Sequence, residues 1–294
     1  EFLEHYHIDP RAIYKFSSFS RLSARADVIP EFEEPLEEIL TKAFPRFATI
    51  DSRRLITFLL RGLSEDITPR SDAEQRMLQM FQYTLYQKSD RDCGFTTPLD
   101  GLRRVRENPV LCAELRALLT YNYNRIDFID EPVDLGFDCP LDLHCTYTRD
   151  QILLALDFDK PSTVREGVKW LPEKNLDIFF ITLNKSEKDY SPTTMYNDYS
   201  ISDTLFHWQS QSTTSETSTT GLRYIHHKAR GSRIALFVRE FKTDHLHGGA
   251  APYTFLGTAS YVQHEGSRPM NVTWKLDRAI PAKYLKKTNK LVVG

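Results

Sequence analysis

RIALFVREF, residues Arg233–Phe241, is the stretch that decides the fold of the second half of this chain. It is an almost unbroken apolar run of strand length, which is typical of a strand at the centre of a sheet. Three other stretches have strand character: LDIFFITLN (Leu176–Asn184), PYTFLGTASYV (Pro252–Val262) and MNVTWKLD (Met270–Asp277). Together they predict a mostly antiparallel β-barrel, because turn sequences such as HGGAAP and HEGSRP separate them.

The last stretch alternates cleanly between apolar and polar residues. Met270, Val272, Trp274 and Leu276 fall on one face, and Asn271, Thr273 and Lys275 on the other. In the stretch before it, Gly257 suggests a bulge or bend.

The first half of the chain has helical periodicity. Helices are expected to begin at Asp51, Ser71, Pro109 and Thr148, and a shorter helix after Pro35 is expected to end at Pro45. The fold class is therefore α+β. We expect a helical coupling domain over residues 1–146 and a β-barrel domain over residues 147–294.

The charge of the chain is divided unevenly along its length. Residues 1–150 hold 19 basic against 26 acidic residues, whereas residues 221–294 hold 13 against 4, a net charge of +9. A basic segment favours a polyanionic partner. No apolar run approaches the roughly 20 residues of a membrane-spanning helix, and the four cysteines, Cys93, Cys112, Cys139 and Cys145, form no CxxC pair. We therefore expect a cytoplasmic protein with reduced thiols, no membrane partner, no metal and no cofactor.

The segment Leu183–Tyr224 combines aromatic rings with hydrogen-bonding side chains and has few aliphatic neighbours. Rings and amides together can stack on bases and contact their edges. A long loop that packs on itself would have the same composition.

Several motifs resemble those of a known family. LNKSEKDYSPTTMYNDYSISDTLFHWQSQ, TGLRYIHH, IALFVREFK, PYTFLG and HEGSRPMNVTWKL are similar to the uncharacterised C-terminal domain of large bacterial restriction proteins, across roughly Tyr147–Pro281. Those proteins carry a phospholipase-D-like nuclease and a superfamily 2 helicase. Type IV, modification-dependent enzymes of the SauUSI kind are examples. The resemblance implies a target-recognition region for 5-methylcytosine or hydroxymethylcytosine in double-stranded DNA. It also implies a barrel similar to SRA and other PUA-like readers, with the nuclease and helicase domains of the parent chain as partners.

Such readers flip a base out of the duplex and enclose it between flat walls, with an acceptor for the exocyclic amine. The YNDY run suggests Asp198 as the acceptor and Tyr196, Tyr199 or Trp208 as walls. A turn-capping aspartate and a core tryptophan are the alternatives for Asp198 and Trp208. His207, Gln209 and Gln211 could reach the groove, and Thr213–Thr220 is expected to be a mobile tip that orders on DNA. The expected phosphate contacts are Lys185, Lys188, Arg223, Lys228, Arg230, Arg233 and Arg268.

Other functions fit parts of the sequence. Glu240-Phe241-Lys242 is an ExK motif that could bind Mg²⁺ together with Asp177 or Asp203 and cut DNA. His226, His227, His245 and His247 could ligate a metal. A module that only holds the parent enzyme together would have no affinity for DNA. The sequence contains no GxxxxGK[ST] phosphate loop, and the acid position of an HxKxxxxD nuclease motif is Arg233. We therefore expect no enzymatic activity from this chain itself.

Overall fold

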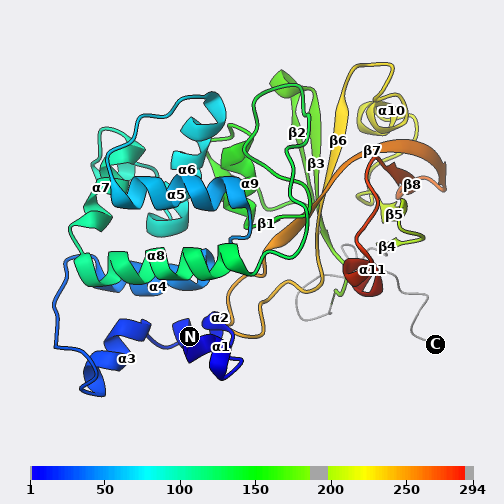
Figure 1. Cartoon of the computed structure of the whole chain (residues 1–294). Coiled ribbons are helices and arrows are strands. Elements are labelled where there is room, and N and C mark those ends of the chain that lie inside the picture. The colour runs from blue at the N-terminus through cyan, green and yellow to red at the C-terminus, as the bar shows by residue number, and fades with distance from the viewer. Residues whose placement is uncertain (1, 186–197, 289–294) are drawn as a thin grey trace. The chain divides into compact units, whose positions relative to one another are not determined.

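The computed structural model describes residues 2–185 and 198–288. The chain divides into two compact units (Figure 1). Unit 1 consists of Glu1–Thr163 together with Asp244–Pro252, and unit 2 consists of Val164–Thr243 together with Tyr253–Gly294.

Unit 1 is built from helices whose apolar stripes face one another. Its α-helices are α1 (Phe2–His5), α2 (Pro10–Tyr14), α3 (Phe19–Arg25), α4 (Glu37–Phe47), α5 (Arg53–Ser64), α6 (Asp72–Tyr86), α7 (Pro98–Arg106), α8 (Pro109–Asn124) and α9 (Arg149–Ala155). The short elements η1 (Arg91–Cys93), β1 (Thr146–Tyr147) and η2 (Pro161–Thr163) complete it. The long helices α4 and α8 run side by side (Figure 1). In α5, the three-four spacing buries Leu55, Phe58, Leu59 and Leu63, as the sequence predicts.

The helix starts are set by small polar residues. Thr148 and Gln151 form the predicted capping box at α9, in which each side chain bonds the backbone of the other residue. The prediction for α5 was one residue off, because the Ser52 hydroxyl accepts from the Leu55 N–H and caps the helix. The Asp51 carboxylate instead accepts from the backbone N–H of Thr146, at 2.6 Å. The prediction that α4 ends at Pro45 was wrong: the helix continues to Phe47, where burial of the last turn outweighs the lost hydrogen bond.

Unit 2 is organised around one sheet. Its strands are β2 (Val168–Leu171), β3 (Leu176–Thr182), β4 (Tyr199–Ser200), β5 (Leu205–Gln209), β6 (Arg233–Arg239), β7 (Tyr253–Glu265) and β8 (Asn271–Leu276). Within the unit the strand order is β2-β3-β6-β7-β8-β5-β4, and every pair is antiparallel except the parallel pair β3–β6. Among the described strands, β2 and β4 are edges that do not pair with each other. The expected barrel is therefore an open, mostly antiparallel sheet.

Gly257 lies at an irregularity of the long strand β7, as the sequence suggests. Leu236 of β6 pairs with Gly257, but the next residue, Phe237, pairs with Phe255, so one extra residue is inserted into β7. Gly257 adopts φ +86°, a left-handed conformation that favours glycine.

One core cluster of unit 2 lies on one face of the sheet, and Phe180, Phe237 and Phe255 are buried on the other face. Phe179, Leu236, Val272 and Trp274 belong to the core cluster, each 0% exposed. The helices α10 (Thr219–Ile225) and α11 (Ala282–Thr288) cover the face with this cluster, and the short helix η3 (Pro172–Lys174) links β2 to β3. Among the described residues, no helix combines the length and the apolar character that crossing a bilayer requires.

Candidate nucleic-acid interface

Strands β5 and β8 present a polar face on the side of the sheet opposite the core cluster. Their alternation sends Phe206 and Trp208 into the core, so His207 and Gln209 project the other way. In β8, the burial of Val272 and Trp274 likewise leaves the polar residues of the strand on the opposite side. This polar face consists of Tyr199, His207, Gln209, Asn271, Thr273 and Lys275.

The strand register brings these side chains into rows. Tyr199 pairs with His207, His207 with Thr273, and Thr273 with Gln263. Four strands at a spacing of about 4.8 Å make this row roughly 14 Å long. Gln209 pairs with Asn271 in the adjacent row.

The rings of Tyr199 and His207 are stacked, with centroids 4.7 Å apart and planes 13° from parallel. Gln209 and Asn271 place amide groups beside this ring pair, and Lys275 adds an exposed ammonium group. Rings, amides and a cation can stack on bases, bond their edges and contact phosphate.

Asp198, the expected acceptor for a cytosine amine, has protein partners on both carboxylate oxygens. Its Oδ2 is 2.9 Å from the Lys185 Nζ, and its Oδ1 accepts the backbone N–H of Gln209 at 2.9 Å. The Asp198 and Lys185 side chains are 3% and 8% exposed. In this arrangement Asp198 attaches the start of β4 to β5, and Lys185 is committed to it rather than to phosphate. This geometry fits the alternative, an aspartate with a structural role, better than an acceptor for a cytosine amine.

Trp208 is a core residue, so it cannot form a wall of a base pocket in this arrangement. Only 4% of it is exposed, and its ring is stacked on Phe179 with centroids 4.1 Å apart. Tyr196 and Lys188 lie outside the described residues. Among the described residues, Tyr199 is therefore the expected pocket residue whose ring lies on the polar face.

Arg223, expected to contact phosphate, forms a two-pronged ion pair with Asp177. Its Nε and Nη2 lie 2.8 and 2.9 Å from the two carboxylate oxygens, and its guanidinium lies 4.3 Å from the Trp170 ring centre. Asp177 is 1% exposed, and burial raises its pKa although Arg223 opposes that shift. Arg223 therefore fastens α10 to the sheet.

The remaining expected cations surround the turn that follows α10 and the loop before β8. Lys228, Arg230 and Arg268 are exposed and Arg233 is half-buried, so these four remain available to a polyanion. Gln211 bonds the Glu166 carboxylate at 3.2 Å. Thr213–Thr220 was expected to be a mobile tip; in the structure Thr214 and Ser215 are buried, and the Ser218 hydroxyl caps α10.

Two parts of the alternative functions have unfavourable geometry: the ExK motif paired with Asp177, and a metal bound by His227. Asp177 and Glu240 lie at opposite ends of the paired strands β3 and β6, because Asp177 pairs with Ile234, six residues before Glu240. At about 3.3 Å per residue they are roughly 20 Å apart, too far to share a magnesium ion. His227 is unsuited to a metal because Nδ1 bonds the Ser232 carbonyl and Nε2 accepts the Tyr261 N–H, both at 3.1 Å.

The residues missed as site candidates are Asn271, Thr273 and Lys275. Their alternation with the apolar residues of β8 already placed them on one face. The sequence did not show that β8 is the neighbour of β5, and only that pairing puts them beside His207 and Gln209.

Comparison with known proteins gives one family. A family described as Domain of unknown function (DUF3427) matches residues 141–287. No curated protein matches the chain.

Proposed function

We propose that unit 2 recognises DNA. The premise is that this chain belongs to the family described as Domain of unknown function (DUF3427). In this proposal unit 2 is the target-recognition module of a modification-dependent restriction system and reads 5-methylcytosine or hydroxymethylcytosine in duplex DNA. It resembles SRA and PUA-like readers in that role, and the nuclease and helicase belong to other parts of the parent protein.

The observation that carries the proposal is the stacked pair Tyr199–His207 beside the amides of Gln209 and Asn271. A flipped base needs a flat surface to stack on and polar groups along its edge, and this face of the sheet offers both. Asp198 has a supporting role, because it bonds the backbone of Gln209 and holds Lys185.

Phosphate attraction is assigned to the cations outside the ring pair. Lys228, Arg230, Arg268 and Lys275 are exposed on unit 2. Contacts of this kind position DNA and strengthen binding without reading sequence. Affinity should therefore fall steeply as salt concentration rises.

The test is an anisotropy titration at fixed salt with three duplexes that differ only in one cytosine: unmodified, methylated or hydroxymethylated. The wild-type protein should prefer a modified duplex. Tyr199→Ala and His207→Ala should each lower affinity for that duplex about tenfold, since stacking on a base is worth roughly 1–3 kcal/mol. Lys275→Ala should weaken binding to all three duplexes alike.

Tyr123→Ala is the matched control, because Tyr123 is 40% exposed and lies in unit 1. Each variant also needs a melting curve, since Tyr199 contributes to a strand. Equal affinity of the wild-type protein for all three duplexes would contradict modified-base reading. If Tyr199→Ala and His207→Ala also bound as tightly as the control, the polar face would not be the interface.

A further inference from the structure

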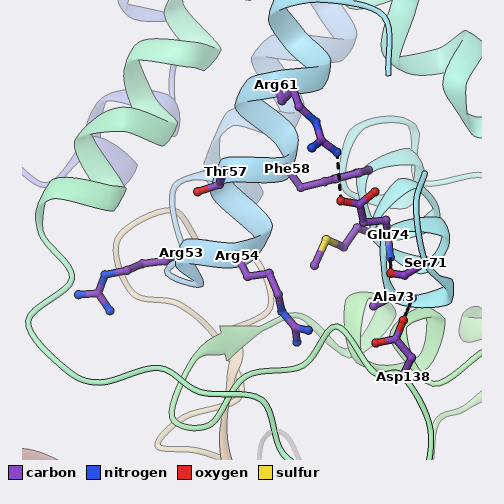
Figure 2. Close-up of a pocket in the computed structure, with 10 residues that line it drawn as sticks. Arg53, Arg54, Thr57, Phe58, Arg61, Ser71, Ala73, Glu74 and Asp138 are labelled. Carbon is purple, nitrogen blue, oxygen red and sulfur yellow. Dashed lines mark hydrogen bonds and ion pairs between the residues drawn. The ribbon is translucent and has the colours of Figure 1, made fainter. Parts of the chain in front are cut away.

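A cavity of about 460 Å³ lies in unit 1 between α5 and the first turns of α6. Figure 2 shows Arg54 and Arg61 projecting from α5 toward the side where Glu74 and Asp138 lie. Phe58 and Met77 supply apolar wall, and both are buried. The volume falls in the range of sites for small molecules, roughly 300–1,000 Å³.

The two arginines keep donor capacity that their protein partners do not use. The Nη2 of Arg54 bonds the Cys139 carbonyl and the Asp142 carboxylate, each at 2.8 Å. The Nη2 of Arg61 bonds Glu74 at 3.0 Å. The Nε atoms of both arginines are buried, and no described residue provides them with an acceptor. Because these Nε atoms are not exposed, the donors open to a ligand are the Nη1 groups, which bond no described residue.

The acids of the cavity are already engaged. One oxygen of Glu74 accepts from Arg61, and the other accepts from the backbone N–H of Arg70 at 2.7 Å. Asp138 accepts from the backbone N–H of Ala73 at 2.9 Å, and this bond lowers the pKa of Asp138. The groups of the cavity that can still bond a ligand are therefore mainly guanidinium N–H donors.

We propose that this cavity binds the phosphate group of a small molecule through Arg54 and Arg61. A guanidinium matches the geometry of phosphate oxygens and keeps its charge at any physiological pH. The apolar wall formed by Phe58 and Met77 would contact the uncharged body of the molecule. This site is separate from the DNA-reading face, since every residue that lines it belongs to unit 1.

The experiment is calorimetric titration of the whole chain with inorganic phosphate and with inorganic pyrophosphate. The wild-type protein should bind at least one of them, and Arg61→Gln should weaken that binding tenfold or more. Arg104→Gln is the matched control, because Arg104 is exposed on α7 and pairs only with Glu107 among the described residues. It should bind as the wild-type protein does.

Glu74→Gln gives a test of opposite sign. Removing this carboxylate charge frees Arg61, so phosphate should bind more tightly to this variant than to the wild-type protein. Arg54 is left intact in every variant because it also bonds Asp142 and the Cys139 carbonyl. Should Arg61→Gln fail to melt cooperatively, Arg61→Lys is the second variant. It keeps the charge but loses the planar guanidinium that bonds two phosphate oxygens at once, so an intermediate loss of affinity is expected.

Three results would overturn the proposal: no heat with either probe, unchanged affinity in Arg61→Gln, or weaker binding in Glu74→Gln. A duplex DNA titration separates the two sources of phosphate. If Arg61→Gln lowered DNA affinity as much as pyrophosphate affinity, the cavity would hold the DNA backbone rather than a small molecule.

Discussion

His227 is a buried histidine that unit 2 holds in its neutral form. Nδ1 donates to the Ser232 carbonyl, and Nε2 accepts the Tyr261 N–H where the β7–β8 register shifts. Burial lowers the pKa of His227 below its ordinary value of 6.5. A proton on Nε2 would remove the acceptor of the Tyr261 N–H.

This predicts a loss of stability in acid. Because the folded-state pKa is lower than the unfolded one, the unfolded chain binds the proton first. The contribution of His227 is therefore full above about pH 6.5 and is lost as the pH falls toward the folded-state pKa. His227→Gln should be less stable at pH 7.5 by about 1–3 kcal/mol, from the imperfectly satisfied Tyr261 N–H, and should lose less stability on acidification.

Urea unfolding of both proteins between pH 7.5 and pH 5 measures this difference. His247 also has a pKa lowered by burial, so the wild-type slope includes its contribution. The difference between the two curves isolates His227. Parallel curves would mean that His227 takes up its proton without loss of the fold.

Individual residues also show why the site was hard to assign from sequence. Aspartate, tryptophan and arginine were reasonable candidates for a base pocket and for phosphate, but a protein partner occupies each of them. Asp198 pairs with Lys185 13 residues away, and Arg223 with Asp177 46 residues away. Residue type indicates which chemistry is available, whereas the fold decides which groups are already used.

Elements were easier to predict than their arrangement. The alternation of β8 and the apolar run of β6 come from local periodicity, and so does the buried stripe of α5. The open sheet was not predicted, because closure depends on whether edge strands such as β2 and β4 meet, which is a non-local property. Pro45 misled the helix prediction for a related reason, since burial of Phe44 and Phe47 extends α4 beyond it.

The bulge of β7 at Gly257 can be tested by substitution. Its φ of +86° is strained for any residue with a Cβ, so Gly257→Ala should lower the free energy of unfolding by about 1–2 kcal/mol. Gly167→Ala is the control, because its added Cβ would meet only the Phe180 carbonyl oxygen at 3.5 Å. Urea unfolding followed by tryptophan fluorescence suits both variants, since Trp170, Trp208 and Trp274 all lie in unit 2. Equal stability of the two variants would show that the bulge relaxes.

The two units differ in charge and in the path that the chain takes through them. The acidic surplus of residues 1–150 lies within unit 1, and the polar face with its surrounding cations lies in unit 2. The chain nevertheless leaves unit 2 after β6, contributes Asp244–Pro252 to unit 1, and returns at β7. A single domain boundary predicted from sequence misses this excursion, because the periodicity along the chain changes from helical to strand only once.

The excursion is fastened to unit 1 by an ion pair that can be tested. Arg11 bonds the Asp244 carboxylate across 233 residues of sequence, and the Asp244 side chain is only 4% exposed.

Breaking a buried pair costs about 3–5 kcal/mol. Because Arg11 is 26% exposed, we expect Arg11→Ala to lower the free energy of unfolding by about 2–3 kcal/mol. Far-UV circular dichroism, which follows the helices of unit 1, should record the change. Lys42→Ala breaks the exposed Lys42–Glu38 pair and should leave stability almost unchanged, because solvent screens this pair. If the two variants were equally stable, Asp244–Pro252 would not depend on Arg11 for its place in unit 1.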